Sequence, residues 1–348
     1  MTVVTTPPTA IGLLIRAALG SGVTISNNMI SLGNGQTTNT QFMGITNSFN
    51  TASLFTYHNT VNIEGAATAG ALPSFCFMRG DNSAASAINS PVDIRNNIFN
   101  NTRTGGTGIH YAIGNNYGNA ASSATGWAAG ASNYNALNGS GATGYWNTTQ
   151  NFAGWKAASA SDANSIAGAA VTFTNSATAD LHLVMGVTPT QLESGGVAGT
   201  GITVDWDNDA RPGPAGSVNG GATAPDMGAD EFDGAPLDLF VPNITYTPLI
   251  NTNCTTNRPF TAVAADNSGI NITPGTRPRI YYKRSTDANA WNDNTNSTDG
   301  WKYAEATNSV SPFAFMIDYS LLNGGTGVTL GNTVQYFVVA QDLAGTPN

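Results

Sequence analysis

Short stretches in which apolar and polar residues alternate recur along the first third of the chain. Alternation at every second position is typical of β-strands that bury one face. Three stretches share one form, a short strand, a polar pair that ends in Asn and a second short strand, and they are residues 23–32, 54–63 and 92–101. Their aligned asparagines are 31 and 38 residues apart, at Asn28, Asn59 and Asn97. This recurrence predicts a repeated structural unit.

A third kind of strand falls between these units and recurs at a similar interval, at residues 41–46, 75–79 and 108–113. Two strands joined by a tight Asn corner, followed by a loop and a third strand, make a three-sided coil. Stacked coils bury inward-facing Ile, Val, Phe and Met side chains that one coil alone leaves in water. Asn tolerates the left-handed backbone of a tight corner. Stacked Asn side chains also form hydrogen bonds along the stack. We expect these asparagines to be structural corner residues.

The Ile-x-Asn-Asn-x-Ile/Phe repeat resembles the right-handed parallel β-helix proteins of the pectate-lyase-like superfamily. Residues 224–232 read Ala-Pro-Asp-Met-Gly-Ala-Asp-Glu-Phe. This segment is similar to the end of β-helix domains in Bacteroidota surface proteins that carry C-terminal sorting signals. The resemblance covers roughly residues 11–233, and it specifies architecture better than activity. It implies an extracellular or cell-surface protein. We expect a β-helix over residues 1–235, with a long excursion near 120–160 that includes a helical turn at 152–158.

The pattern changes after Pro236. Six strand-like runs with turn residues between them follow, at residues 243–249, 259–265, 279–284, 301–306, 313–319 and 333–341. Their spacing predicts a β-sandwich. The ending at 336–345 resembles the penultimate strand and turn of immunoglobulin-like and fibronectin-III-like modules. The expected fold is therefore all-β, a right-handed parallel β-helix followed by an immunoglobulin-like sandwich over 236–348.

Both ends of this predicted fold are unfinished. A seven-stranded sandwich needs one more strand after Gly345, which either further chain or a partner supplies by β-addition. The first coil begins near residue 11 without an amphipathic cap, and an uncovered coil is an open sheet edge. We expect a segment of a longer protein. Self-association of the open ends, head to tail, is the alternative.

Composition narrows the classes of partner. Charged residues make up 9% of the 348 residues, and the formal net charge is −9 with a pI of about 4.5. A basic surface for nucleic acid is therefore absent. No apolar run reaches the roughly 18 residues of a membrane span. Cys76 lies in an apolar strand and is expected to be a core residue, with a disulfide to Cys254 as the alternative.

One acidic segment is a candidate calcium site. Asp205, Asp207 and Asp209 have alternate spacing. On an extended segment this spacing places three carboxylates on one face, as ligation of a hard cation requires. Asp226, Asp230 and Glu231 approach them if the loop folds back. The alternative is that Arg211 pairs with one of these acids and locks the final turn.

Catalytic residues are sought on strands, because the resemblance implies that lyases and hydrolases on this fold place carboxylates and a basic residue on a sheet face. The candidates are Arg79, Asp81 and His110. Arg79 and His110 fall on equivalent strands of successive coils and are expected to be neighbours. Asp93 and Arg95 alternate on one strand face and are expected to pair with each other. The alternative for all of them is a solvated strand face, since no lyase or hydrolase motif surrounds them.

Exposed aromatic rings on a polar surface of low charge suit sugar stacking. The candidates are Trp127, Tyr145, Trp146 and Trp155, and the alternative is that they cover the core at the excursion. The leading hypothesis is a non-catalytic extracellular stalk or adhesin that contacts a polysaccharide or surface glycan. The second is a polysaccharide lyase or glycoside hydrolase, and the third a structural subunit that assembles head to tail. Calcium is the one cofactor for which the sequence offers candidate ligands.

Overall fold

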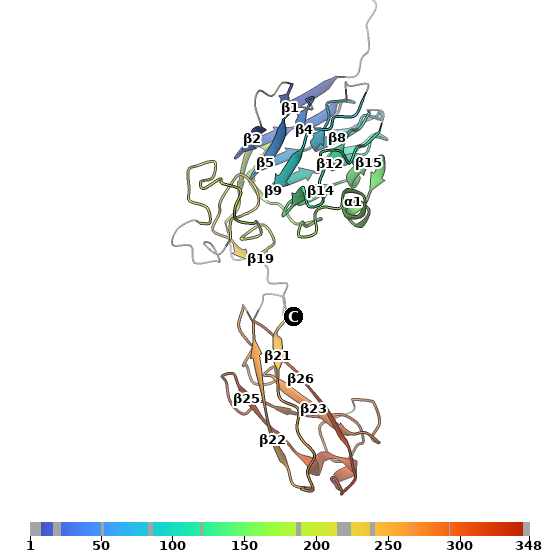
Figure 1. The fold of residues 1–348 in the computed structure, drawn as a ribbon, viewed down its shortest axis with the longest axis vertical. Helices are drawn as coiled ribbons and strands as arrows, with labels where there is room; N and C mark the ends of the chain where they lie inside the picture. The colour runs from blue at the N-terminus through green and yellow to red at the C-terminus, as the bar shows by residue number, and fades with distance from the viewer. Residues whose placement is uncertain are drawn as a thin grey trace, which may run out of the picture. The chain divides into compact units, whose positions relative to one another are not determined.

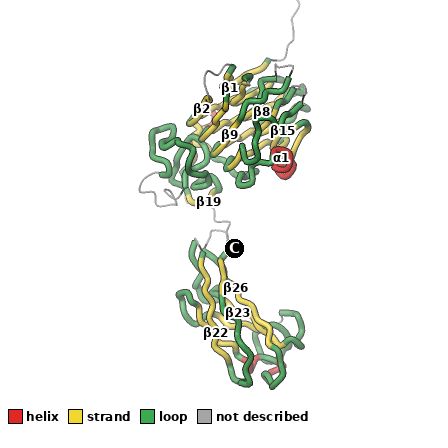
Figure 2. Tube along the Cα trace, viewed as in Figure 1, coloured by secondary structure: helices red, strands yellow, loops and turns green. Residues whose placement is uncertain are grey.

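The computed structural model describes residues 8–16, 22–49, 52–82, 86–118, 121–185, 189–213, 224–236, 241–266, 268–291 and 293–343. Strands account for 39% of the chain and helices for 6%, which confirms the prediction of a broadly all-β protein (Figures 1 and 2). The chain divides into two compact units, Met1–Pro236 and Leu237–Asn348. Each unit has its own apolar core. No described helix has both the length and the apolar character that crossing a bilayer requires.

The largest sheet of unit 1 has six strands, and their order in the sheet follows their order in the sequence. They are, in sheet order, β1 (Thr9–Ile15), β4 (Gln41–Asn47), β8 (Ser74–Arg79), β12 (His110–Asn115), β15 (Ala142–Trp146) and β16 (Thr148–Gln150). The first five are parallel, and β16 returns antiparallel to β15. Figure 1 shows these strands side by side across the unit. Each interval between parallel neighbours is one repeat of the sequence pattern.

Two four-stranded parallel sheets hold the strand–Asn–strand units. One contains β2 (Gly22–Ser26), β5 (Ser53–Tyr57), β9 (Val92–Arg95) and β13 (Ser132–Asn133). The other contains β3 (Met29–Leu32), β6 (Thr60–Ile63), β10 (Ile98–Asn101) and β14 (Ala136–Gly139). The three predicted units are therefore formed. A fourth unit, β13 to β14, lies within the segment predicted as an excursion, so 120–160 contributes strands to all three sheets.

The remaining elements of unit 1 are short. Helix α1 (Phe152–Ser159) follows β16 and confirms the helical turn expected there. The side chain of Asn151 caps its N-terminus by accepting from the Gly154 N–H. The other pairs are β7 (Ala66–Ala67) with β11 (Thr104–Gly105), β17 (Phe173–Asn175) with β18 (Asp180–Leu183), and β19 (Pro189–Thr190) with β20 (Ala235–Pro236). A 3₁₀ turn spans Ser176–Thr178.

The left-handed corner residues are Asn27, His58, Asn96 and Tyr134, with φ between 52° and 60°. Each stands one position before the aligned asparagine, so the prediction that the aligned residue takes this conformation is wrong by one residue. A left-handed backbone suits Asn and His better than most residues. The aligned asparagine is instead free to point inward and form hydrogen bonds.

The predicted asparagine ladder is present. The Nδ2 of Asn28 donates to Oδ1 of Asn59 at 2.8 Å, Asn59 to Asn97 at 3.0 Å and Asn97 to Asn135 at 2.9 Å. The backbone N–H of each of the first three also donates to the same oxygen of the next rung. Asn135 extends the ladder by a rung that the repeat pattern did not predict. The ladder ties each coil to the next at the same corner.

Apolar side chains from all three sheets fill the interior of unit 1. Its fully buried members include Ile45, Leu54, Val61, Phe77, Ile94, Phe99, Ile113 and Leu137. Trp155 of α1 joins this core, and a Cβ on Gly144 of β15 would stand 2.4 Å from its ring. Glycine is therefore required at position 144 for the indole to pack flat on the strand. Cys76 is buried in the same core, whereas Cys254 is exposed. Both thiols are free, so the disulfide alternative is wrong.

Unit 2 consists of two three-stranded antiparallel sheets. One contains β21 (Asn243–Thr245), β22 (Arg258–Ala265) and β25 (Phe313–Ile317), and the other β24 (Lys302–Glu305), β23 (Arg279–Arg284) and β26 (Val334–Val339). Alternate residues of both sheets meet in one core, among them Phe260, Ile280, Tyr282, Phe315 and Ile317. Two 3₁₀ turns span Tyr319–Leu321 and Asn323–Gly325. The strand expected after Gly345 lies outside the described residues.

The ladder yields a stability prediction. In Asn97→Ala, the backbone N–H of Asn59 loses its acceptor, and the side chains of Asn59 and Asn135 each lose one hydrogen bond of the ladder. A buried polar group without a partner costs ~1–3 kcal/mol, so we expect the variant to lower the free energy of unfolding of unit 1 by about 2–4 kcal/mol. Calorimetry of the intact chain measures this loss. Asn164 is exposed, and Asn164→Ala is the control, with an expected change within about 0.5 kcal/mol. Equal effects of the two substitutions would contradict a structural role for the ladder.

Candidate functional site

Arg79, the first catalytic candidate, is fully buried. Its guanidinium donates to Oδ1 of Asn115 at 2.8 and 3.0 Å and to the carbonyls of Ser90 at 3.2 Å and Thr125 at 2.8 Å. The same group lies over the ring of Trp127, 5.3 Å from its centre. Burial lowers the pKa of Arg79 to about 10. Arg79 therefore fastens the chain that follows β12.

His110 is not a neighbour of Arg79, as the strand register shows. On the paired strands β8 and β12, His110 stands opposite Ser74, whereas Arg79 stands opposite Asn115. Five residues of strand separate the two positions, roughly 16 Å at the rise of a β-strand. Nδ1 of His110 lies 2.9 Å from the hydroxyl of Ser74, and burial lowers the pKa of the imidazole. The expected pair is therefore wrong, because both side chains take part in separate structural contacts.

The remaining charged strand residues are also engaged. Asp81 follows β8 and is buried. Arg95 and Asp93 form the predicted ion pair at 2.7 Å, and the Tyr57 hydroxyl donates to Asp93 at 2.8 Å. The ion pair lies within β9, and the Tyr57 hydrogen bond links β5 to β9. They favour the interpretation of the strand charges as structural.

The aromatic residues of the predicted excursion belong largely to the interior. Trp127 and Trp155 are buried, and with Trp146 they pack edge to face at 5.5–6.0 Å between ring centres. Nε1 of Trp155 donates to the buried Asp162 at 2.7 Å. Tyr145 packs edge-on against neighbouring tyrosines. The prediction that these four rings form an open sugar platform is wrong for Trp127 and Trp155, because they complete the core beneath α1.

The acidic segment does not have the extended form on which the calcium prediction relied. Oδ1 of Asp205 accepts the backbone N–H groups of Asp207 and Asp209, both at 2.8 Å, and its Oδ2 accepts the N–H of Glu231 at 2.9 Å. The segment is therefore a turn wrapped around the Asp205 carboxylate. An extended face shared by the three carboxylates is absent, and Asp207 points instead to His182, at 2.8 Å.

Arg211 adopts the alternative role considered for it, that of a lock on the final turn. It forms an ion pair with Glu231, and both side chains are almost completely buried. The guanidinium also donates to the carbonyls of Gly228 at 3.1 Å and Ala229 at 2.9 Å. Glu231 accepts the N–H of Gly213 at 3.0 Å. The pair therefore holds the loop that contains Arg211 against the loop that contains Glu231.

Two further carboxylates of this loop region are buried near the ion pair. Asp226 accepts the N–H groups of Ser194 at 2.6 Å and Phe232 at 2.8 Å, while Glu193 accepts the N–H of Gly234 at 2.9 Å. Burial, together with nearby carboxylates, raises the pKa of Asp226 to about 9 and that of Glu193 to about 7. Their hydrogen bonds to loop backbone indicate a structural role.

Half-buried and exposed aromatic rings line one face of the sheet β24–β23–β26 in unit 2. In register, Tyr281 of β23 stands opposite Tyr303 of β24 and opposite Phe337 of β26. Tyr281 and Phe337 are stacked, with ring centres 5.3 Å apart and planes at 9°. The centres of Tyr281 and Tyr303 are 5.7 Å apart. Because side chains alternate along β23, the flanking Ile280 and Tyr282 point into the core.

Two tryptophans of the connection between β23 and β24 widen this row. The ring of Trp291 lies 5.6 Å from that of Tyr281 and 5.4 Å from that of Tyr303. Trp301 meets Phe337 edge-on at 5.0 Å. The surfaces of Trp291 and Phe337 are 49% and 41% exposed. We call Tyr281, Trp291, Trp301, Tyr303 and Phe337 the aromatic face.

Polar groups border the aromatic face. Arg279 lies over the ring of Tyr303 at 4.3 Å and forms an ion pair with Glu305 at 2.8 Å. A hollow of about 280 Å³ adjoins it, and Arg277, Arg279, Tyr281 and Gln341 contribute to its lining. Rings beside fixed hydrogen-bonding groups are the usual make-up of a site for a small, partly apolar ligand. The three strands carry their aromatic residues far apart in the sequence, so only the sheet register reveals the row.

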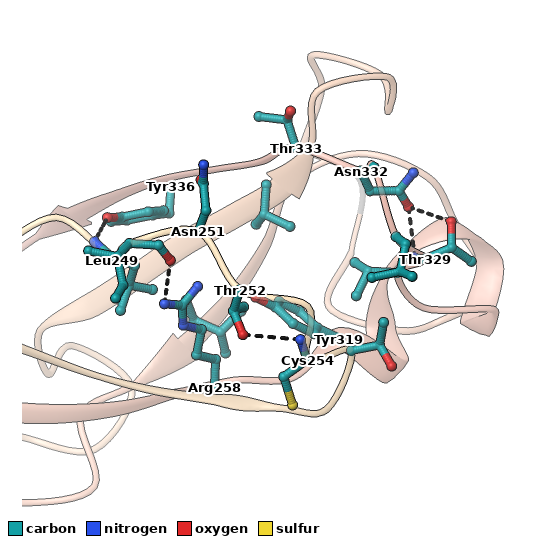
Figure 3. Close-up of a pocket in the computed structure, with 17 residues that line it drawn as sticks. Leu249, Asn251, Thr252, Cys254, Arg258, Tyr319, Thr329, Asn332, Thr333 and Tyr336 are labelled. Carbon is teal, nitrogen blue, oxygen red and sulfur yellow. Dashed lines mark hydrogen bonds between the residues drawn. The ribbon is translucent and has the colours of Figure 1, made fainter.

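A larger hollow of about 350 Å³ lies elsewhere in unit 2, between residues 249–258 and β26 (Figure 3). The Leu249 N–H donates to the hydroxyl of Tyr336 at 2.6 Å, and Arg258 donates to the carbonyl of Ile250 at 2.5 Å. Figure 3 marks the hydrogen bond between Leu249 and Tyr336. Its described lining includes no carboxylate and no histidine.

A third group of side chains has the make-up of a metal site. One nitrogen of His182 and one oxygen each of Asp207 and Asp230 lie within 4.8 Å of one another. His182 and Asp207 are partly exposed, whereas Asp230 is buried. The sequence indicated an acidic site here, but it did not indicate the histidine, which comes from β18.

The buried carboxylates yield a pH prediction. The folded chain raises the pKa of Asp226 to about 9 and that of Glu193 to about 7, whereas both are near 4 in the unfolded chain. Between the unfolded and the folded pKa of each group, the folded state therefore binds more protons than the unfolded state. The stability of unit 1 therefore falls as pH rises from 7 to 9. Calorimetry is expected to show a lower Tm for unit 1 at pH 9 than at pH 7, and a shallower slope in Asp226→Asn. A Tm that rises over this range, or an unchanged slope in the variant, would refute the assignment.

Comparisons with known proteins add nothing to this description of the side chains, because they found no match. A functional assignment must therefore come from the arrangement of the described side chains. Of the groups above, the aromatic face combines partly exposed rings in register across three strands with bordering polar side chains. No family model, no curated protein and no solved structure matches the chain.

Proposed function

We propose that unit 1 is a right-handed parallel β-helix and unit 2 an immunoglobulin-like sandwich of an extracellular or cell-surface protein. The stacked parallel strands, one per repeat in each sheet, and the asparagine ladder support the first assignment. Parallel crossovers in one sheet are almost always right-handed, which supports the hand. The two antiparallel sheets around one core support the second assignment.

We propose further that the module is a non-catalytic stalk or adhesin that binds a glycan through the aromatic face. The observation that carries this proposal is the row of Tyr303, Tyr281 and Phe337, half-buried or exposed, in register across three strands. A pyranose ring presents a face of C–H bonds, which packs on an aromatic plane and removes apolar area from water. Arg279 and Glu305 stand beside the row, where sugar hydroxyls would meet them.

The alternative of a polysaccharide lyase has less support. Arg79 and His110, which it would use, are buried in separate structural contacts. A general acid and base within reach of one bond is what catalysis requires. The aromatic face offers stacking planes and hydrogen-bonding groups, which suffices for binding.

Binding to insoluble and soluble polysaccharides, measured by pull-down and calorimetry on the intact chain, tests the glycan proposal. We expect one or more neutral or acidic polysaccharides to bind. Tyr281→Ala and Trp291→Ala are each expected to weaken the affinity by about tenfold or more, which corresponds to about 1.4 kcal/mol. The control is Trp206→Ala, because Trp206 of unit 1 is as exposed as Trp291, at 51%, and it should leave binding unchanged.

Two results would overturn the proposal. One is binding that survives both substitutions on the aromatic face, or that is lost in Trp206→Ala. The other is a lyase product, detected by ultraviolet absorbance of its unsaturated sugar, whose formation stops in His110→Ala while the variant stays folded. Absence of binding to any polysaccharide tested would also count against the glycan as ligand.

A further inference from the structure

The group formed by His182, Asp207 and Asp230 draws its members from three separate segments of unit 1. His182 lies on β18, Asp207 in the turn organised by Asp205, and Asp230 in the segment that the Arg211–Glu231 pair holds. Nε2 of His182 is 2.8 Å from Oδ2 of Asp207. One ligand atom from each of the three lies within 4.8 Å of the other two. Such convergence from distant parts of the chain is a property of the tertiary fold.

The imidazole is oriented by a second carboxylate on its far side. Nδ1 of His182 is 2.5 Å from Oδ1 of Asp180, two residues earlier on the same strand. A hydrogen bond from Nδ1–H to Asp180 directs the lone pair of Nε2 toward Asp207 and Asp230. This is the arrangement by which metal-binding histidines are held, with a carboxylate on the nitrogen that does not bind the metal. The ring edge also packs against Trp206 at 5.3 Å.

The two aspartates are held in place before any ligand arrives. The Leu183 N–H donates to Oδ2 of Asp230 at 2.6 Å, and this fixes the buried carboxylate beside β18. Asp205 accepts the N–H of Asp207 at 2.8 Å, which fixes the turn that carries it. The lone pair of Nε2 then faces two anionic groups, so a positive charge belongs between them. A proton on Nε2 or a metal ion supplies that charge.

We propose that His182, Asp207 and Asp230 bind a zinc ion and that Asp180 positions the imidazole. An imidazole with two carboxylates is a zinc-type ligand set, whereas Ca²⁺ prefers six or more oxygen ligands. Zn²⁺ needs only four ligands, so one position is left for water or for an oxygen of another molecule. The ion joins β18 to the closing segment of unit 1. This inference concerns unit 1 and is independent of glycan binding by unit 2.

The test is zinc titration of the intact chain after treatment with a chelator, by calorimetry and by the Tm of unit 1. A Cys254→Ser background removes the exposed thiol, which is another ligand for zinc. We expect saturable binding of one ion per chain and a Tm that rises with zinc concentration, since an ion that binds only the folded state stabilises it. Ca²⁺ at the same concentration is expected to give a smaller rise.

Substitutions separate ligands from neighbours. His182→Ala and Asp207→Asn are expected to abolish saturable binding, and because Asp207 is exposed, its variant is expected to fold. Asp180→Asn should weaken the affinity by about 10- to 100-fold and leave one ion per chain. The matched control is Asp209→Asn, an exposed aspartate two residues from Asp207 and outside the group, which should bind zinc as the parent does.

Three outcomes would overturn the zinc site. They are the absence of saturable zinc binding in the parent, binding that survives Asp207→Asn, and binding that is lost in Asp209→Asn. An equal rise in Tm with Ca²⁺ would likewise reject zinc as the preferred ion. With Co²⁺ in place of zinc, the visible absorption should report nitrogen and oxygen ligands. A thiolate charge-transfer band that is present in the chain with Cys254 and absent from Cys254→Ser would indicate that the metal binds at Cys254 instead.

Discussion

The hydrogen-bonded stacking of parallel coils is the constraint on which the structure of unit 1 depends. Asn28, Asn59, Asn97 and Asn135 bind one another at one corner, and this fixes the register of every coil on the next. The register in turn decides which strand residues face the interior. It buries Arg79 opposite Asn115, and it separates Arg79 from His110. Residues that have catalytic potential in the sequence thus become structural ties in the fold.

Local patterns were sufficient to predict the strand–Asn–strand units, the turn of helix at 152–158 and the Asp93–Arg95 pair, because each depends on neighbouring residues or on one repeat. They were insufficient where long-range packing decides. The burial of Trp155 depends on the space above Gly144, and the turn at Asp205 depends on hydrogen bonds to its own backbone and to Glu231. The aromatic face needs the register of three strands whose residues are 22 and 34 positions apart, at Tyr281, Tyr303 and Phe337.

A division of roles between the units follows from these contacts, if the proposed function holds. Unit 1 uses its polar side chains internally, in the ladder, in the Arg79 contacts and in the Arg211–Glu231 lock. Unit 2 presents aromatic rings to solvent on one sheet face. A surface with few charges relies on stacking and on neutral hydrogen bonds for recognition, and those are the interactions that a sugar offers.

Hydrogen–deuterium exchange on the intact chain, with and without a bound polysaccharide, tests this division most directly. The account predicts slower exchange on binding in β23, β24, β26 and the chain around Trp291. It predicts no change in the stacked strands β4, β8 and β12, whose side chains are buried. Protection confined to those strands of unit 1, with unit 2 unchanged, would contradict it.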